Sequence, residues 1–114
     1  MALKVKREVI KKAELRKIFT RLSKKLKAEK LPVKDVILFG SYAHGTPDGD
    51  SDIDVALVVF GKITAKVKKD FDNIHYLVKS VNVKLEPHVM STGDYNNRWS
   101  SIAGEVRKHG IKMS

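Results

Sequence analysis

The sequence predicts an α/β (α+β) domain in which one β-sheet of three to four strands is flanked by helices. Two stretches, 5–30 and 63–80, repeat apolar residues at helical spacing. Three shorter stretches have the apolar or alternating patterns of strands, at 36–39, 52–60 and 81–90. The chain has 114 residues and shows no internal repeat or linker, so we expect residues 1–114 to form a single domain.

The first predicted element is a basic amphipathic helix at about 5–30, which Pro32 ends. Residues 1–34 hold 13 Lys and Arg against three Glu, giving +10, and this equals the net charge of the whole chain. Such a segment can attract polyanions, so nucleic-acid binding through residues 1–34 stays open. A solvated helix face is the favoured interpretation.

Two carboxylates mark the start of the second predicted strand. Asp52 and Asp54 precede and enter an apolar run that ends at Phe60, and residues two apart lie on the same face of a strand. Glu86, on the third predicted strand, would join them if the two strands are neighbours. Three converging carboxylates repel one another, and Mg²⁺ or Mn²⁺ would relieve the repulsion. This donor set is typical of two-metal phosphoryl or nucleotidyl transfer.

A glycine-containing turn follows the first predicted strand. Gly40 lets the backbone approach a ligand closely, and Ser41 adds a hydroxyl. A single helical turn at 42–43, closed by Gly45, would place backbone N–H groups for phosphate binding. A phosphate-binding turn beside an acidic metal site indicates a nucleoside triphosphate as substrate.

The remaining chain supplies predicted structural elements. Thr64 is a candidate N-cap for the helix at 63–80. Ser91 and Thr92 are candidate N-caps for a last helical region, which Gly110 ends. In that region an apolar stripe is expected to face the core: Trp99, Ile102, Ala103 and Val106. The spacing of His75, His88 and His109 is not that of metal ligands, so surface or satisfied polar roles are expected for them, while His44 is left open between a surface role and a ligand contact.

The central motif carries a resemblance to a known family. Gly40-Ser41, ten intervening residues and Asp52-Ile53-Asp54 resemble the signature of the DNA polymerase β-type nucleotidyltransferase superfamily. The short chain and its ending at 105–111 resemble the minimal nucleotidyltransferases (MNT). The resemblance implies a mixed, palm-like sheet and Mg²⁺ or Mn²⁺ with ATP. It also implies that Asp52 and Asp54 hold the metals while Glu86 completes one metal site and assists the attacking hydroxyl.

The same resemblance extends to the nucleotide and the partner. Gly40 and Ser41 would bind the triphosphate, and Ser51 is the third expected nucleotide-binding residue. Many MNT proteins are antitoxins that bind a HEPN-domain protein and add AMP to a tyrosine, so a HEPN-type partner, or otherwise a homo-oligomer, is expected. Two features depart from the family pattern: His44 stands where Arg is frequent, and Pro87 removes a backbone N–H, which indicates an edge strand or a bulge.

Two other functions remain as alternatives. One is a non-catalytic module that neutralises a partner protein through an apolar face left exposed on the N-terminal helix or on the sheet. The other is the basic nucleic-acid-binding domain described above. The chain has no apolar run near the length of a membrane span, so membrane insertion is not expected. It has no cysteine and a charged N-terminus, so a cytoplasmic location is expected.

Overall fold

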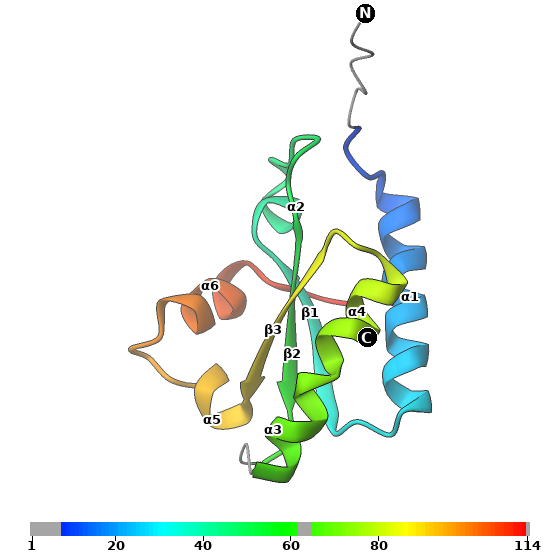
Figure 1. Cartoon of the computed structure of the whole chain (residues 1–114). Helices are drawn as coiled ribbons and strands as arrows, with labels where there is room; N and C mark the ends of the chain where they lie inside the picture. The colour runs from blue at the N-terminus through cyan, green and yellow to red at the C-terminus, as the bar shows by residue number, and fades with distance from the viewer. Residues whose placement is uncertain (1–7, 62–64, 114) are drawn as a thin grey trace, which may run out of the picture.

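The computed structural model describes residues 8–61 and 65–113 of the chain (Figure 1). In chain order its elements are α1 (Lys12–Ala28), β1 (Val33–Phe39), α2 (Ser41–His44), β2 (Ile53–Val59), α3 (Ala65–Asp72), α4 (Ile74–Val81), β3 (Leu85–Ser91), α5 (Thr92–Tyr95), α6 (Ser101–His109) and β4 (Ile111–Lys112). The four described strands form one sheet in the order β3-β2-β1-β4, with β2 and β3 parallel and the other neighbours antiparallel. The predicted mixed sheet with flanking helices is confirmed.

Strand β2 lies inside the sheet and is buried on both faces. One set of its side chains, which includes Ile53, Val55 and Leu57, packs in the core with the apolar sides of α1 and α4. The alternate set, with Ala56 and Val58, packs with Val106 of α6. In Figure 1, α1 and α4 accordingly cover one side of the sheet and α6 covers the other. Asp54 belongs to the alternate set by its position, so its carboxylate is on the α6 side.

Helix α1 is shorter than the predicted helix at 5–30. Its buried side chains follow the expected spacing, at Leu15, Ile18, Phe19, Leu22 and Leu26. Residues 8–11 are not helical, which corrects the prediction within the described residues, and the predicted start at 5 lies outside them. The backbone N–H of Ile10 donates to the Tyr42 hydroxyl at 3.2 Å, so a contact with α2 overrides the local helical pattern.

The predicted helix at 63–80 is two helices, α3 and α4, separated at Asn73. Its predicted start and the Thr64 cap lie outside the described residues. The third strand begins at Leu85 and not at Val81, which ends α4. Asn82 causes the difference: its side chain accepts from the Lys84 N–H at 2.9 Å and its carbonyl from the Leu85 N–H at 3.1 Å, forming a turn that leaves Val83 78% exposed.

The predicted last helical region is two helices, α5 and α6; Ser91 caps the first, and Ser100 caps the second. Ser91 begins α5 with a capping box shared with Asp94, as its position predicted. Trp99 is not in the core: its side chain is 94% exposed, because it lies in the connection between α5 and α6 and not on a helix. Ile102 is 41% exposed, whereas Ala103 and Val106 are buried. No helix among the described residues is long and apolar enough to span a bilayer.

We expect substitution of Phe19 by Ala to lower the free energy of unfolding by about 3–5 kcal/mol, because the ring is 1% exposed and would leave a cavity between α1 and the sheet. Trp99→Ala removes a larger side chain from an exposed position and should change the same quantity by less than about 0.5 kcal/mol. Urea denaturation of both variants measures this contrast. A large loss in Trp99→Ala would contradict the exposed placement of the connection between α5 and α6.

Candidate active site

The turn after β1 adopts the conformation that its glycines predict. Gly40 has φ +74° and ψ −154°, and its carbonyl accepts from the N–H groups of Ala43 and His44 at 3.0 Å each. Helix α2 is the predicted single helical turn, and Gly45 ends it in the left-handed conformation. The first backbone N–H groups of such a turn have no acceptor within the turn, which makes it a candidate phosphate site.

Gly40 is in close contact with Asp54, the acidic residue within β2. Phe39 and Asp54 are paired across β1 and β2, which places the turn directly beside the Asp54 carboxylate. A Cβ built on Gly40 would collide with that carboxylate, and its positive φ also disfavours any other residue. The two halves of the predicted site, the glycine turn and the acidic strand, are therefore adjacent in space.

The loop between the turn and β2 is held by its own polar groups. The Ser51 hydroxyl accepts from the Asp48 N–H at 2.9 Å, and the Ser51 N–H donates to the Asp48 carbonyl at 3.2 Å. Lys84 donates to the Gly49 carbonyl at 2.7 Å and anchors the loop to the segment before β3. Asp52 follows this loop and is exposed, whereas Asp54 is half-buried.

Asp54 and Glu86 are register partners on the neighbouring parallel strands β2 and β3. Adjacent strands are about 4.8 Å apart, so the two side chains can reach a common cation. Glu86 accepts from the Lys79 ammonium of α4 at 3.2 Å, and both side chains of this ion pair are about 40% exposed. The oxygens of Asp52, Asp54 and Glu86 are not gathered within 4.8 Å of one another in this structure.

Strand β3 is the edge of the sheet, as Pro87 indicated. It pairs with β2 in an unbroken register from Ile53 with Leu85 to Val59 with Ser91, so the strand contains no bulge on that side. An edge position tolerates proline because alternate N–H groups have no strand partner there. Glu86 therefore has a defined place opposite Asp54.

His88 is a polar neighbour of the acids that sequence reasoning did not select. Its Nε2 lies 3.4 Å from Asp54 Oδ1, and its ring packs edge-on against Phe39 with centroids 5.0 Å apart. The signal in the sequence was its position two residues after Glu86, which places both side chains on one face of a strand. An open hollow of about 450 Å³ adjoins His88 and continues between β3 and the start of α6.

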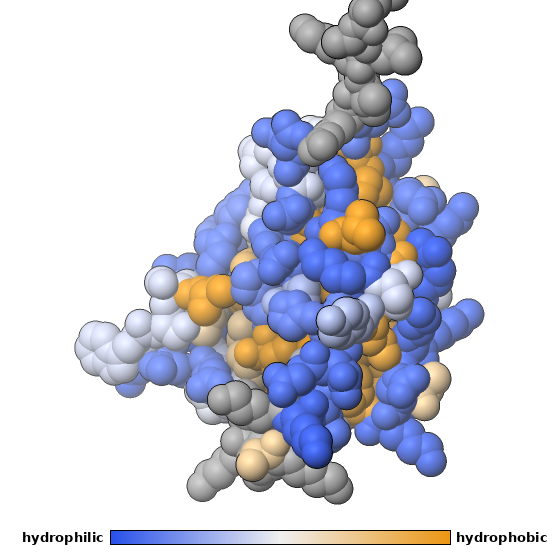
Figure 2. All heavy atoms as spheres, viewed as in Figure 1, coloured by the Kyte–Doolittle hydropathy of each residue, from blue (hydrophilic) through white to orange (hydrophobic). Residues whose placement is uncertain are grey.

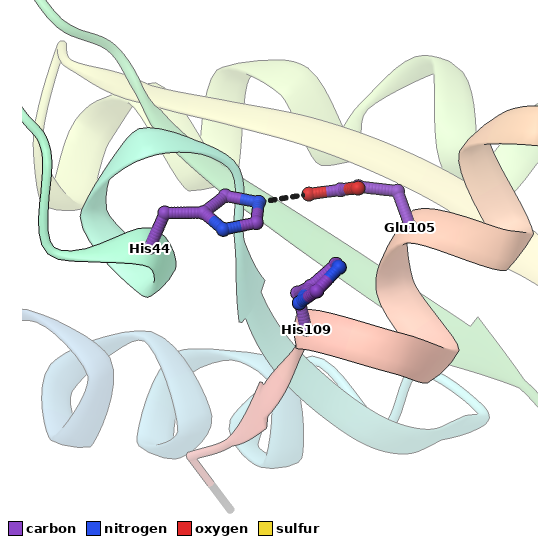
Figure 3. A group of neighbouring side chains, drawn as sticks. All are labelled: His44, Glu105 and His109. Carbon is purple, nitrogen blue, oxygen red and sulfur yellow. Dashed lines mark hydrogen bonds and ion pairs between the residues drawn. The ribbon is translucent and has the colours of Figure 1, made fainter.

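A second polar group lies at the other end of α2 (Figure 3). The side chains of His44, Glu105 and His109 point toward one another, the first from α2 and the other two from α6. His44 Nε2 contacts Glu105 Oε1, and the two imidazole rings are 4.5 Å apart at their centroids. Sequence reasoning treated His109 as isolated; the spacing of Glu105 and His109, four apart on a helix, was the available signal.

A family model described as a nucleotidyltransferase domain matches residues 15–106, which is most of the chain. The chain belongs to the nucleotidyltransferase family. The matched range contains the glycine turn, both strand acids and Glu86. The resemblance drawn from the Gly40-Ser41 and Asp52-Ile53-Asp54 motif is thus confirmed at the level of the family.

Solved structures show the same fold at low sequence identity. A nucleotidyltransferase candidate from Sulfolobus solfataricus aligns with a TM-score of 0.59 and 22% identity, covering 88% of this nucleotidyltransferase and 79% of that chain. A toxin–antitoxin complex with AMP-PNP aligns with a TM-score of 0.58 and 18% identity, over 84% and 72% of the two chains.

A third similar structure is a complex of a tri-AMPylated HEPN toxin from Shewanella oneidensis with an MNT antitoxin. It aligns with a TM-score of 0.52 and 16% identity, covering 87% of this nucleotidyltransferase and 71% of that chain. No curated protein sequence matches the chain. At these identities the solved structures establish the fold of the chain, in agreement with the family match.

Gly40 and Gly45 allow a comparison of two substitutions. Both have φ +74°, but Gly45 has ψ 21°, where Ala costs about 1–2 kcal/mol, whereas Gly40 has ψ −154°, a conformation that glycine alone adopts readily. Only at Gly40 does the added methyl also meet the Asp54 carboxylate; nothing lies within 4 Å of the Cβ position at Gly45. We expect Gly40→Ala to lower the free energy of unfolding by more than Gly45→Ala, measured by urea denaturation. Equal losses would contradict the close approach of the turn to Asp54.

Proposed function

We propose that this nucleotidyltransferase transfers AMP from ATP to a hydroxyl group of a protein partner in a Mg²⁺-dependent reaction. The observation that carries the proposal is the contact between the Gly40 turn and the Asp54 carboxylate, with Glu86 as the register partner of Asp54. In the proposed reaction the Gly40 turn would take a phosphate, and Asp54 and Glu86 would take a cation beside it. A nucleoside triphosphate bound as its magnesium complex needs both.

The donor set fits Mg²⁺, or Mn²⁺ in its place. Asp52, Asp54 and Glu86 offer only carboxylate oxygens, which are the hard ligands that these ions prefer. Asp54 and Glu86 face a shared space on neighbouring strands, and Asp52 precedes Asp54 at the open end of β2. When bound there, the ion supplies positive charge to the reacting phosphate.

The reaction requires an acceptor hydroxyl close to the α-phosphate of ATP. Its oxygen attacks the α-phosphorus, a P–O ester bond forms, and the bond between the α- and β-phosphates breaks. Pyrophosphate leaves with the electron pair of that bond, and the hydroxyl proton passes to a carboxylate, for which we propose Glu86. Gly40 and Ser41 would bind the β- and γ-phosphates through backbone N–H groups and the Ser41 hydroxyl. Ser51 would hold the loop beside them, since its hydroxyl already bonds Asp48.

The hollow beside His88 is the proposed place for the nucleoside. Half of its lining residues are apolar and half are polar: Val89, Met90, Ile102 and Ala103, and His88, Asp94, Asn97 and Ser100. The apolar residues offer contact to a base, and the polar ones offer hydrogen bonds. His88 also contacts Asp54, so a nucleoside in the hollow would have its phosphates directed to the acids and the glycine turn.

The proposed protein partner is of the HEPN type, and the proposed acceptor is a tyrosine hydroxyl on it. Support comes from the similar structures, in which an antitoxin is bound to a toxin, in one case a tri-AMPylated HEPN toxin. The apolar side of α1 is not available for docking, because it is buried against the sheet; this corrects the idea that α1 leaves an apolar face exposed. Figure 2 shows a mainly hydrophilic face with apolar side chains only in patches.

A non-catalytic neutralising module is the second candidate. The Lys79–Glu86 ion pair favours it, since a carboxylate already neutralised by a lysine has less need of a metal ion. The ion pair is about 40% exposed, however, and such pairs contribute only about 0–1 kcal/mol, so a divalent cation could displace Lys79. The transfer reaction therefore remains the function that the geometry supports best.

We expect Asp54→Asn to weaken the binding of ATP with Mg²⁺ by about tenfold or more, because the substitution removes one anionic metal ligand. Loss of a residue that only supports a metal ligand already lowers metal affinity or activity by about 10–100-fold. Titration calorimetry of the purified chain measures this. Asp72→Asn, which changes an exposed carboxylate at the end of α3, is the matched control and should bind as the wild type does. Equal affinities in Asp54→Asn and wild type would overturn the metal assignment.

Transfer itself is tested with the protein encoded beside this chain, co-expressed and then incubated with ATP labelled at the α-phosphate. We expect label on the partner with wild type and none with Asp54→Asn. A partner that is neutralised equally by both forms, and never labelled, would identify the non-catalytic module instead. Label attached to the nucleotidyltransferase alone would indicate self-modification and would contradict the proposed acceptor.

A further inference from the structure

We propose that His44, Glu105 and His109 form a binding site for a divalent transition-metal ion, with Zn²⁺ as the expected occupant. Within the described residues these three side chains form a group in which one ligand atom from each lies within 4.8 Å of the others. The site is separate from the acids of the proposed nucleotide site. It goes beyond the proposed function and does not depend on it.

The fold brings the three ligands together from two elements. Glu105 and His109 are four residues apart on α6, a spacing that places two side chains on the same face of a helix, with Cβ atoms about 5–6 Å apart. His44 is the last residue of α2, and its side chain extends toward α6 and contacts Glu105, as Figure 3 shows. The ligands are therefore positioned before any ion binds.

The spacing is close to what zinc requires. Metal–ligand distances of about 2.0–2.2 Å in a tetrahedral site put neighbouring ligand atoms about 3.3–3.6 Å apart. The three ligand atoms already lie within 4.8 Å of one another, and His44 already contacts Glu105. Small rotations of exposed side chains would close the remaining difference, and the fourth position would be filled by water.

The ligand types distinguish this site from the acidic one. Two imidazoles and one carboxylate favour Zn²⁺ and related transition metals, whereas an all-carboxylate set favours Mg²⁺. Glu105 is half-buried and the two histidines are exposed, so an ion can enter from solvent without disturbing the core. Excess Mg²⁺ is accordingly expected to compete poorly for this site.

An ion here would join the two elements that flank the end of β1. Gly40 and Ser41 lie at the start of α2 and His44 at its end, while α6 packs on the sheet through Val106. Binding of an ion would fix α2 to α6 and so limit movement of the glycine turn. The proposed role is structural, with no part in bond making or breaking.

The simpler alternative is a metal-free contact. The His44–Glu105 interaction and the packing of the two imidazole rings would then by themselves hold α2 against α6. The two alternatives differ in one measurable property, which is saturable binding of one ion per chain that depends on both histidines.

The test uses the full chain without a polyhistidine tag, stripped of metal with a chelator and titrated with ZnCl₂ by calorimetry in the presence of excess Mg²⁺. We expect one ion per wild-type chain, and loss of affinity by about a hundredfold in His44→Ala and in His109→Ala, because each removes a direct ligand. His75→Ala changes an exposed histidine on α4 and is the matched control, expected to bind as the wild type does. Glu105→Gln keeps the shape of the side chain and separates loss of a ligand from loss of folding.

A second readout is independent of nucleotide transfer. Co²⁺ should give the visible absorption of a four-coordinate ion with wild type and with Asp54→Asn, and not with His44→Ala. Zn²⁺ in excess should also raise the Tm of the wild type and leave that of His109→Ala unchanged. Absence of saturable Zn²⁺ binding, or equal affinity in wild type and both histidine variants, would overturn the proposal. Since Asp54→Asn is expected to keep the zinc site, failure here and failure of the proposed function are distinguishable.

Discussion

The candidate site depends on the close approach of the Gly40 backbone to the Asp54 carboxylate. The pairing of Phe39 with Asp54 across β1 and β2 sets this contact, and a Cβ at position 40 would collide with Asp54 Oδ2, so the carboxylate or the turn would have to move. The pairing in turn rests on β2, which is buried on both faces and has little freedom to shift its register. A turn suited to phosphate and an acid suited to a cation are thus held together by the core and not by flexible loops.

The same strand explains why the acids occur where β2 begins. Farther along, the alternate positions are Ala56 and Val58, which α6 covers, and a carboxylate there would lose its water without gaining a partner. At Asp54 the packing of α6 on the sheet no longer buries the strand fully, and the Asp54 side chain is about 30% exposed. The site therefore lies at the boundary between the packed core and solvent, where a charged group is tolerated and a ligand can reach it.

The parts that the sequence predicts well are those whose pattern reflects burial alone. The spacing of Leu15, Phe19 and Leu22 and the apolar run of β2 identify a helix and a strand because the core determines both. Predictions were wrong where a single polar contact decides the structure, as at Ile10, whose N–H bonds Tyr42, and at Asn82, whose side chain forms a turn. An apolar periodicity records neither contact. Ile10 and Tyr42 meet only in the finished fold, whereas the turn at Asn82 is local and its signal is the asparagine itself.

The candidate site also contains features that the sequence predicts and features that only the fold reveals. The strand patterns predicted that Glu86 joins the two aspartates if the second and third strands are neighbours, but not its register opposite Asp54. The ion pair between Glu86 and Lys79 was not predicted either, because it depends on how α4 packs beside β3. The group of His44, Glu105 and His109 joins residues 61 and 65 positions apart, and only the packing of α6 beside α2 brings them together. The two proposed cation sites lie at the two ends of α2, the carboxylate site beside its start and the site of His44, Glu105 and His109 at its end. Because α2 is only four residues long, a ligand that restrains one end of it would also restrain the backbone at the other end.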